Sequence, residues 1–138
     1  MSEGNLLRQI GRTGRAMHAA FEREVGIALP KWRILQTLHE SGRLSQKDLA
    51  SMLSMDPGAL TRQLKQIESE LLVKRESSRE DNRLTLVELT SKGCELVESL
   101  GEKRINFSKK ALEGLEEEKM AVALEILKAM EDRFRAAD

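Results

Sequence analysis

Four apolar residues near the middle of the chain recur at a spacing of 4, 3 and 4: Leu60, Leu64, Ile67 and Leu71. This period predicts an amphipathic helix with one buried stripe and a polar opposite side. Asp56 and Pro57 predict its start, because a carboxylate can accept an unpaired backbone N–H and a proline at the first helical position needs no donor. We therefore expect a helix whose polar side carries Thr61, Arg62 and Lys65.

A shorter helix is predicted just before it. Ser45 and Asp48 have the spacing of a capping box, and Leu44 and Leu49 have the spacing of a hydrophobic staple. Two short helices separated by a turn are typical of a helix-turn-helix.

A β-hairpin is predicted directly after the second helix. Residues 73–89 alternate as strand residues on either side of a polar tip at 77–82. Arg79 and Arg83 lie in or beside this tip, and Asp81 is placed to brace Arg83. The fold class is therefore mainly α with a small β-wing, a winged helix-turn-helix.

Further helices are predicted on both sides of the winged unit, over residues 5–25, from Leu29 to near Ser41, from Thr90 onward, and over roughly 116–136. The apolar stripes of the first and the last two exceed what the small winged unit can cover, which favours a two-fold dimer. We expect one domain, 1–138, in which 1–29 and 91–138 are dimerisation helices and 30–90 is the DNA-binding region. The expected dimer interface comprises Leu6, Ile10, Phe107, Leu112, Leu124, Leu127 and Phe134.

Composition argues against a disulfide-stabilised, metal-binding or membrane-spanning protein. Cys94 is the only cysteine, so no intrachain disulfide forms, and His18 and His39 are too few and too isolated for a metal site. No apolar run approaches the roughly 20 residues of a membrane helix, and no secretory signal is evident, so we expect a cytoplasmic protein. Cys94 is expected to be an inert, buried core thiol rather than a redox sensor.

The net charge of zero is unusual for a nucleic-acid-binding protein. Residues 43–83 contain eight cationic and seven acidic side chains, a net charge of only +1. Binding to DNA would therefore depend on where the cationic side chains lie rather than on the net charge of this region. The cations on the predicted helix face and ribbon can reach guanine edges, phosphates or a narrow minor groove. The alternative for Arg62 and Lys65 is an ordinary solvated helix face.

The stretch KRESSREDNRLTLVELTSKG resembles the wing of the MarR family of bacterial transcriptional regulators, with Asp81, Asn82 and Arg83 at its tip. LPKWRILQTLHESGRLSQKDLASML and DPGALTRQLKQIESELLVKR resemble that family's second to fourth helices. One departure is Leu71, where the family usually has a glycine that ends the helix in a left-handed conformation.

The resemblance implies a homodimer formed by the terminal helices, with an effector pocket that commonly holds small aromatic acids. Arg15 and His18, one turn apart, would pair a carboxylate beside Trp32; the alternative is an exposed Arg15 and a histidine satisfied elsewhere. Peroxide-sensing relatives carry a cysteine in the first helix, which this chain lacks. The residues expected to bind DNA are Ser45, Gln46, Asp56, Pro57, Gly58, Ala59, Thr61, Arg62, Lys65, Arg75, Arg79, Asp81 and Arg83.

The sequence thus predicts a homodimeric, sequence-specific regulator that binds a pseudo-palindromic DNA operator as a repressor and is released by a small phenolic or aromatic-acid ligand. It needs no cofactor or metal. A rival hypothesis is a winged-helix protein-interaction module that works through the acidic segment 113–132. An enzyme has little support, because no nucleophile with a paired base, metal cluster or glycine-rich phosphate loop is evident.

Overall fold

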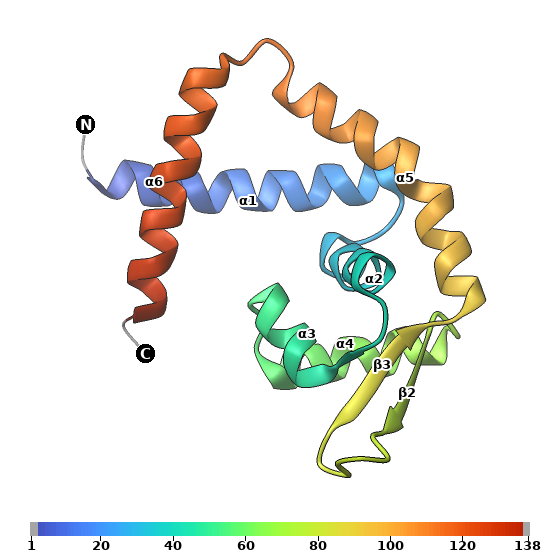
Figure 1. The fold of residues 1–138 in the computed structure, drawn as a ribbon. Helices are drawn as coiled ribbons and strands as arrows, with labels where there is room; N and C mark the ends of the chain where they lie inside the picture. Colours follow the sequence, from blue (N-terminus) through green and yellow to red (C-terminus); the bar gives the residue numbers. More distant parts are fainter. Residues whose placement is uncertain (1–2, 137–138) are drawn as a thin grey trace. The chain divides into compact units, whose positions relative to one another are not determined.

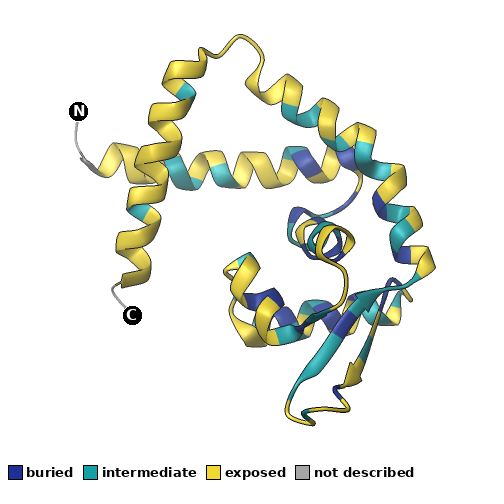
Figure 2. Ribbon diagram, in the orientation of Figure 1, coloured by how far each residue is buried: buried dark blue, intermediate teal, exposed yellow. Residues whose placement is uncertain are grey.

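The computed structural model describes residues 3–136, so the first two and last two residues of the expected terminal segments lie outside it. The chain forms two compact units, 1–107 and 108–138, which are described separately (Figure 1). The first unit contains the winged region and most of the buried side chains (Figure 2). No helix in the described range is long and apolar enough to cross a membrane.

The first unit begins with two helices, α1 (Glu3–Val25) and α2 (Leu29–Ser41). Gly26 lies between them with φ of 91°, a left-handed conformation that favours glycine. The core-facing residues of α2 are apolar and buried: Leu29, Trp32, Ile34, Leu35 and Leu38.

The helix-turn-helix consists of α3 (Gln46–Leu53) and α4 (Pro57–Ser69). Both predicted caps are confirmed. The Asp48 backbone N–H donates to Ser45 Oγ at 3.0 Å, and the Ala59 N–H donates to Asp56 Oδ2 at 3.0 Å. Each helix start is therefore encoded by a local hydrogen bond.

The wing is a three-stranded antiparallel sheet in the order β1-β3-β2. Strands β2 (Val73–Ser77) and β3 (Thr85–Leu89) form the predicted hairpin. Strand β1 (Leu44–Ser45), which pairs Leu44 with Val87, was not predicted because two residues are too short to show alternation. This strand ties the start of α3 to the wing.

The predicted buried stripe of α4 is wrong at its last member. Leu60, Leu64 and Ile67 are at most 1% exposed, but Leu71 is 67% exposed and lies beyond the helix end. Leu71 has φ of 65°, so it takes the left-handed conformation that glycine usually supplies, despite its side chain. This turn moves the apolar position one residue along, to Leu72, which is 4% exposed.

The exit from α4 is fastened to the start of α5 (Ser91–Leu112). The Thr90 hydroxyl donates to the Leu71 carbonyl at 2.6 Å, the Thr90 N–H donates to the Leu72 carbonyl at 3.0 Å, and Lys92 Nζ donates to the Glu70 carbonyl at 2.9 Å. These three bonds satisfy backbone carbonyls of the turn that follows α4. Thr90 also caps α5, as predicted, by accepting the Gly93 N–H at 3.1 Å.

The second unit contains the end of α5 and α6 (Glu117–Ala136), with Gly114 at φ of 79° between them. None of the described residues of α6 is buried (Figure 2). Its apolar side chains are exposed along the helix, including Leu124, Leu127 and Phe134.

Candidate nucleic-acid interface

The polar side of α4 carries the cations that the sequence assigned to DNA. Arg62 and Lys65 are exposed, while Leu60, Leu64 and Ile67 are buried on the other side of the helix. The remaining predicted residues at the start of α4 are exposed or half-buried: Pro57, Gly58, Ala59 and Thr61. Gly58 is the smallest of them, which leaves the first turn of α4 open to close approach by a ligand.

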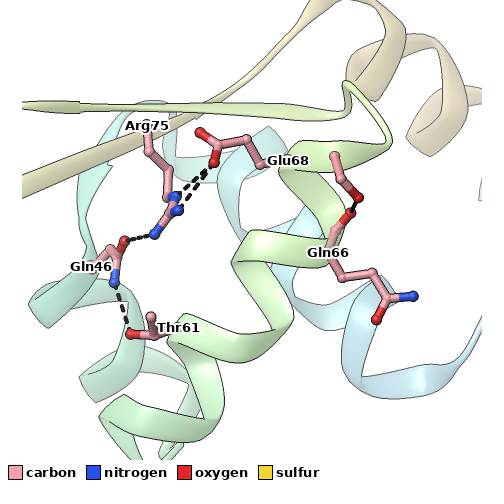
Figure 3. Close-up of polar contacts among 6 residues, drawn as sticks. Gln46, Thr61, Gln66, Glu68 and Arg75 are labelled. Atoms are coloured by element: carbon pink, nitrogen blue, oxygen red, sulfur yellow. Dashed lines mark hydrogen bonds and ion pairs between the residues drawn. The ribbon is translucent and has the colours of Figure 1, made fainter.

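Three of the predicted DNA-binding side chains bind one another (Figure 3). Arg75 Nη1 on β2 donates to Gln46 Oε1 on α3 at 3.1 Å, and Gln46 Nε2 donates to Thr61 Oγ1 on α4 at 3.3 Å. Thr61 Oγ1 in turn donates to the Pro57 carbonyl at 3.0 Å. The helix-turn-helix and the wing are therefore joined by a continuous chain of hydrogen bonds.

Arg75, the cation in this series of hydrogen bonds, is paired with the carboxylate of Glu68. Arg75 Nε and Nη2 lie 3.3 and 3.0 Å from Glu68 Oε1, and the Arg75 side chain is only 19% exposed. The side-chain hydrogen bond from Arg75 lowers the pKa of Glu68 below its usual value; burial opposes this shift, and the charge of Arg75 adds to the lowering. The sequence analysis did not predict a role for Glu68. The available signal was its position seven residues before Arg75, on the other side of the turn from helix to strand.

The tip of the wing is held by hydrogen bonds within the turn. Arg83 Nε lies 3.0 Å from Asp81 Oδ1, which confirms the predicted brace, and the Arg83 backbone N–H donates to the same oxygen at 3.0 Å. These bonds to Arg83 lower the pKa of Asp81. Ser78, which the sequence did not single out, is 8% exposed, and its hydroxyl accepts the N–H groups of Glu80 and Asp81 at 3.3 Å each.

The wing cations differ in how they are paired. The Arg83 side chain is 90% exposed despite its brace, and Arg79 is also exposed at the tip. Nearer the base, Arg43 pairs with Glu76 at 2.7 Å and Lys74 pairs with Glu88 at 3.1 Å. The tip therefore presents two exposed arginines, one of which is paired with Asp81, while Arg43 and Lys74 are paired with acids elsewhere on the wing.

The residues expected to bind an effector lie in different surroundings. Arg15 and His18 are exposed on α1, whereas Trp32 on α2 is 3% exposed, with its ring centroid 6.4 Å from that of Phe21. Phe21 also meets Phe107 edge to face, with the centroids 5.2 Å apart. Trp32 is therefore part of an aromatic cluster in the core.

A further polar group near this cluster was missed by the sequence. Arg104 on α5 is half-buried, and its Nε is buried without a hydrogen-bond partner in the described part of the chain. Arg104 and Phe107 are three residues apart on one helix and therefore share a face. An arginine on an otherwise apolar helix face was the available signal.

The predicted dimer residues are mostly exposed in the single chain. Leu6, Leu112, Leu124, Leu127 and Phe134 are 46 to 63% exposed, and Ile10 is half-buried. Phe107 differs, because its ring packs on Phe21 within the first unit. Among the described residues, no group of three His, Cys, Asp or Glu side chains is arranged to hold a metal ion, and Cys94 is half-buried.

This combination of two capped helices, an exposed cationic helix face and a braced hairpin with exposed arginines at its tip defines a winged helix-turn-helix protein. A model of the MarR family matches residues 27–85. The chain is 33% identical over 132 residues to the uncharacterized HTH-type transcriptional regulator YdgJ of Bacillus subtilis (strain 168), an alignment that covers 96% of this chain and 80% of YdgJ. The chain therefore belongs to the MarR family of transcriptional regulators, a family of non-enzymes.

Solved structures agree on the fold. A mutant MarR from E. coli, complexed with operator DNA, has a TM-score of 0.83 and 23% identity, covering 91% of this chain and 93% of that one. The PcaV transcriptional regulator of Streptomyces coelicolor, in complex with its natural ligand, has a TM-score of 0.84 and 19% identity, covering 96% and 93%. These likenesses confirm the predicted fold class.

Proposed function

We propose that this protein is a cytoplasmic, homodimeric repressor that binds a pseudo-palindromic DNA operator through α4 and the wing and is released by a small aromatic acid or phenol. The observation that carries the DNA-binding part is the pair of exposed cationic elements on one winged unit. Arg62 and Lys65 lie on the polar side of α4, where a recognition helix meets base edges. Arg79 and Arg83 lie at the wing tip, where they can reach phosphates or the minor groove.

The net charge of zero is compatible with this proposal. Ion pairs such as Arg75 with Glu68 and Arg43 with Glu76 cancel part of the charge, while Arg79 and the Asp81-paired Arg83 remain exposed at the tip of the wing. Affinity for DNA depends on the cations that reach phosphates rather than on the total charge. The mutant E. coli MarR, which shares the fold, was solved in complex with operator DNA, and this supports DNA binding by the present chain.

A homodimer follows from the exposed apolar side chains of α1, α5 and α6. Covering them against the same helices of a second copy places two recognition helices at half-sites about one DNA turn apart. Occupying such an operator excludes polymerase, so repression needs no catalysis.

The DNA-binding part is tested by fluorescence anisotropy on a duplex selected from a random library and on a scrambled duplex, at several salt concentrations. We expect Arg62→Ala to lose discrimination between the two duplexes, because a bidentate arginine reads a base. We expect Arg83→Ala to weaken both equally and to reduce the salt slope by about 0.9, the effect of one lost phosphate contact. Arg33→Ala, which removes an exposed cation from α2, is the matched control and should change neither quantity.

Equal loss on both duplexes for Arg62→Ala would remove Arg62 from base readout. Failure of the unsubstituted protein to bind any duplex, at any salt concentration, would overturn the proposal and favour the protein-interaction module, with 113–132 as its acidic surface.

We place the effector between α1 and the aromatic cluster of the first unit. Arg15 and His18 offer charge and hydrogen bonds from α1, and PcaV, a structural neighbour, was solved with its natural ligand. The buried, unpartnered Nε of Arg104 beside Phe107 is a second candidate partner for a carboxylate. A ligand that binds more tightly to a dimer whose recognition helices are wrongly spaced shifts the population away from the DNA-binding form. The size of this shift is set by the difference between the ligand's affinities for the two forms.

The effector proposal is tested by titrating salicylate and benzoate into the protein–DNA complex. Release of the duplex by the unsubstituted protein is the expected result. Arg15→Ala or Arg104→Ala should raise the concentration needed for release while leaving DNA affinity without ligand unchanged. Release at the same concentration in both variants would exclude both arginines from the effector site.

A further inference from the structure

The chain of hydrogen bonds from β2 to α4 can run in one direction only. At one end, the guanidinium of Arg75 has donors and no acceptor; at the other, the Pro57 carbonyl has acceptors and no donor. Gln46 must therefore turn Oε1 toward Arg75 and Nε2 toward Thr61 (Figure 3). Thr61 must point its hydroxyl hydrogen at the Pro57 carbonyl. The orientation of the Gln46 amide, which alone would be free to flip, is set from both sides.

This orientation leaves a defined set of free groups on Gln46. One N–H of Nε2 and one lone pair of Oε1 are used, so one donor and one acceptor remain. A glutamine with one donor and one acceptor free matches the N7 acceptor and N6 donor of adenine in the major groove. Gln46 is half-buried at the first position of α3, directly across from Thr61 on the recognition helix.

Arg75 itself is poorly suited to bind a phosphate. Two of its nitrogens face Glu68 Oε1, a third faces Gln46, and its side chain is 19% exposed. Its charge is offset by a carboxylate whose own pKa it lowers. Arg83 at the wing tip also pairs with a carboxylate, that of Asp81, but its side chain is 90% exposed and so stays accessible to a phosphate.

We propose that Arg75, held by Glu68, is a positioning residue that orients the Gln46 amide to read adenine, and that Arg75 makes no DNA contact of its own. This inference rests on the proposed DNA-binding function. Base discrimination would then come from Gln46 on α3, and Arg75 on β2 would set the orientation of the Gln46 amide.

The experiment starts from a duplex that the unsubstituted protein selects from a random library. Anisotropy is measured on that duplex and on duplexes with each base pair exchanged in turn, at several salt concentrations. For Gln46→Ala we expect discrimination of roughly 5- to 150-fold to disappear at one A·T pair per half-site. For Arg75→Gln we expect loss at the same pair, an unchanged salt slope, and no additional loss when combined with Gln46→Ala.

Glu68→Gln is the second variant and keeps an oxygen acceptor for Arg75 while removing the negative charge. If Arg75 positions Gln46, discrimination at the A·T pair is retained in Glu68→Gln. This variant keeps the proposal testable if Arg75→Gln fails to fold by circular dichroism.

Three results would overturn the proposal. One is a fall of about 0.9 in the salt slope of Arg75→Gln with equal loss on every duplex, which identifies a phosphate contact. Another is tighter binding of Glu68→Gln to all duplexes, which identifies Arg75 as a cation released onto DNA. A third is unchanged discrimination at every A·T pair in Gln46→Ala. Absence of binding to any duplex by the unsubstituted protein would instead overturn the proposed function, and with it this inference.

Discussion

Substitution of Gly93 by alanine tests the packing between the exit of α4 and the start of α5. Gly93 is buried in the first turn of α5, and a Cβ added there would lie 2.2 Å from the Leu72 carbonyl oxygen and 3.1 Å from Leu89 Cδ2. The first distance is about 1 Å shorter than a normal carbon–oxygen contact, and the obstacle is backbone rather than a movable side chain. Gly93→Ala therefore forces α5 and the Leu72 segment apart.

The expected cost follows from three effects. Overpacking costs about 1–3 kcal/mol, and weakening the bond from Thr90 N–H to the Leu72 carbonyl adds about 0.5–1.5 kcal/mol. The higher helix propensity of alanine returns about 1 kcal/mol. We expect a net loss of about 2 kcal/mol in the free energy of unfolding.

Gly101→Ala is the matched control. Gly101 lies in the same helix, and a Cβ added there meets no atom within 4 Å in the structure, so only the propensity gain of about 1 kcal/mol remains. Urea denaturation at one fixed protomer concentration measures both variants, because the stability of a dimer depends on concentration. The two substitutions should change stability in opposite directions, and equal or greater stability of Gly93→Ala than of the unsubstituted protein would refute the proposed close packing.

The remaining predictions concern the exit of α4 and the pair at Glu68. Leu71→Gly should raise the free energy of unfolding by about 0.5–1 kcal/mol, because glycine adopts the left-handed conformation of this exposed position without strain. Leu72→Ala should lower the free energy of unfolding by about 2–5 kcal/mol, because Leu72 is buried. A lower free energy of unfolding for Leu71→Gly would show instead that the Leu71 side chain stabilises the turn. Because the folded-state pKa of Glu68 lies below its unfolded value of 4.5, its pairing stabilises the protein above pH 4.5 and that contribution is lost as the pH falls through the folded value. The stability difference between the unsubstituted protein and Glu68→Gln, measured by urea denaturation across pH, should therefore shrink in acid, and a difference that does not vary with pH would contradict the pairing.

Much of the fold follows from local signals that the sequence carries in full. Ser45 and Asp56 start their helices through hydrogen bonds within three residues, and the buried stripe from Leu60 to Ile67 follows from helical period alone. The Asp81 brace of Arg83 is equally local, since the two residues are separated by one. Such features were predictable because their partners are near neighbours in the chain.

Features that depend on distant partners were not predictable in this way. Strand β1 exists only because Leu44 lies opposite Val87, and Leu71 turns left-handed where bonds from Thr90 and Lys92 satisfy the carbonyls around it. Helical period had instead placed Leu71 in the core.

The sequence by itself determined the class of the protein, the starts of its helices and the set of cationic side chains on α4 and at the wing tip. The tertiary structure alone decided how those residues divide. It pairs Arg75 with Glu68 and Gln46, across 7 and 29 positions of the chain, while the side chain of Arg83 stays 90% exposed. A pattern of residue types gives the charge of each arginine, but only the folded chain determines which acceptors lie within hydrogen-bonding distance of it.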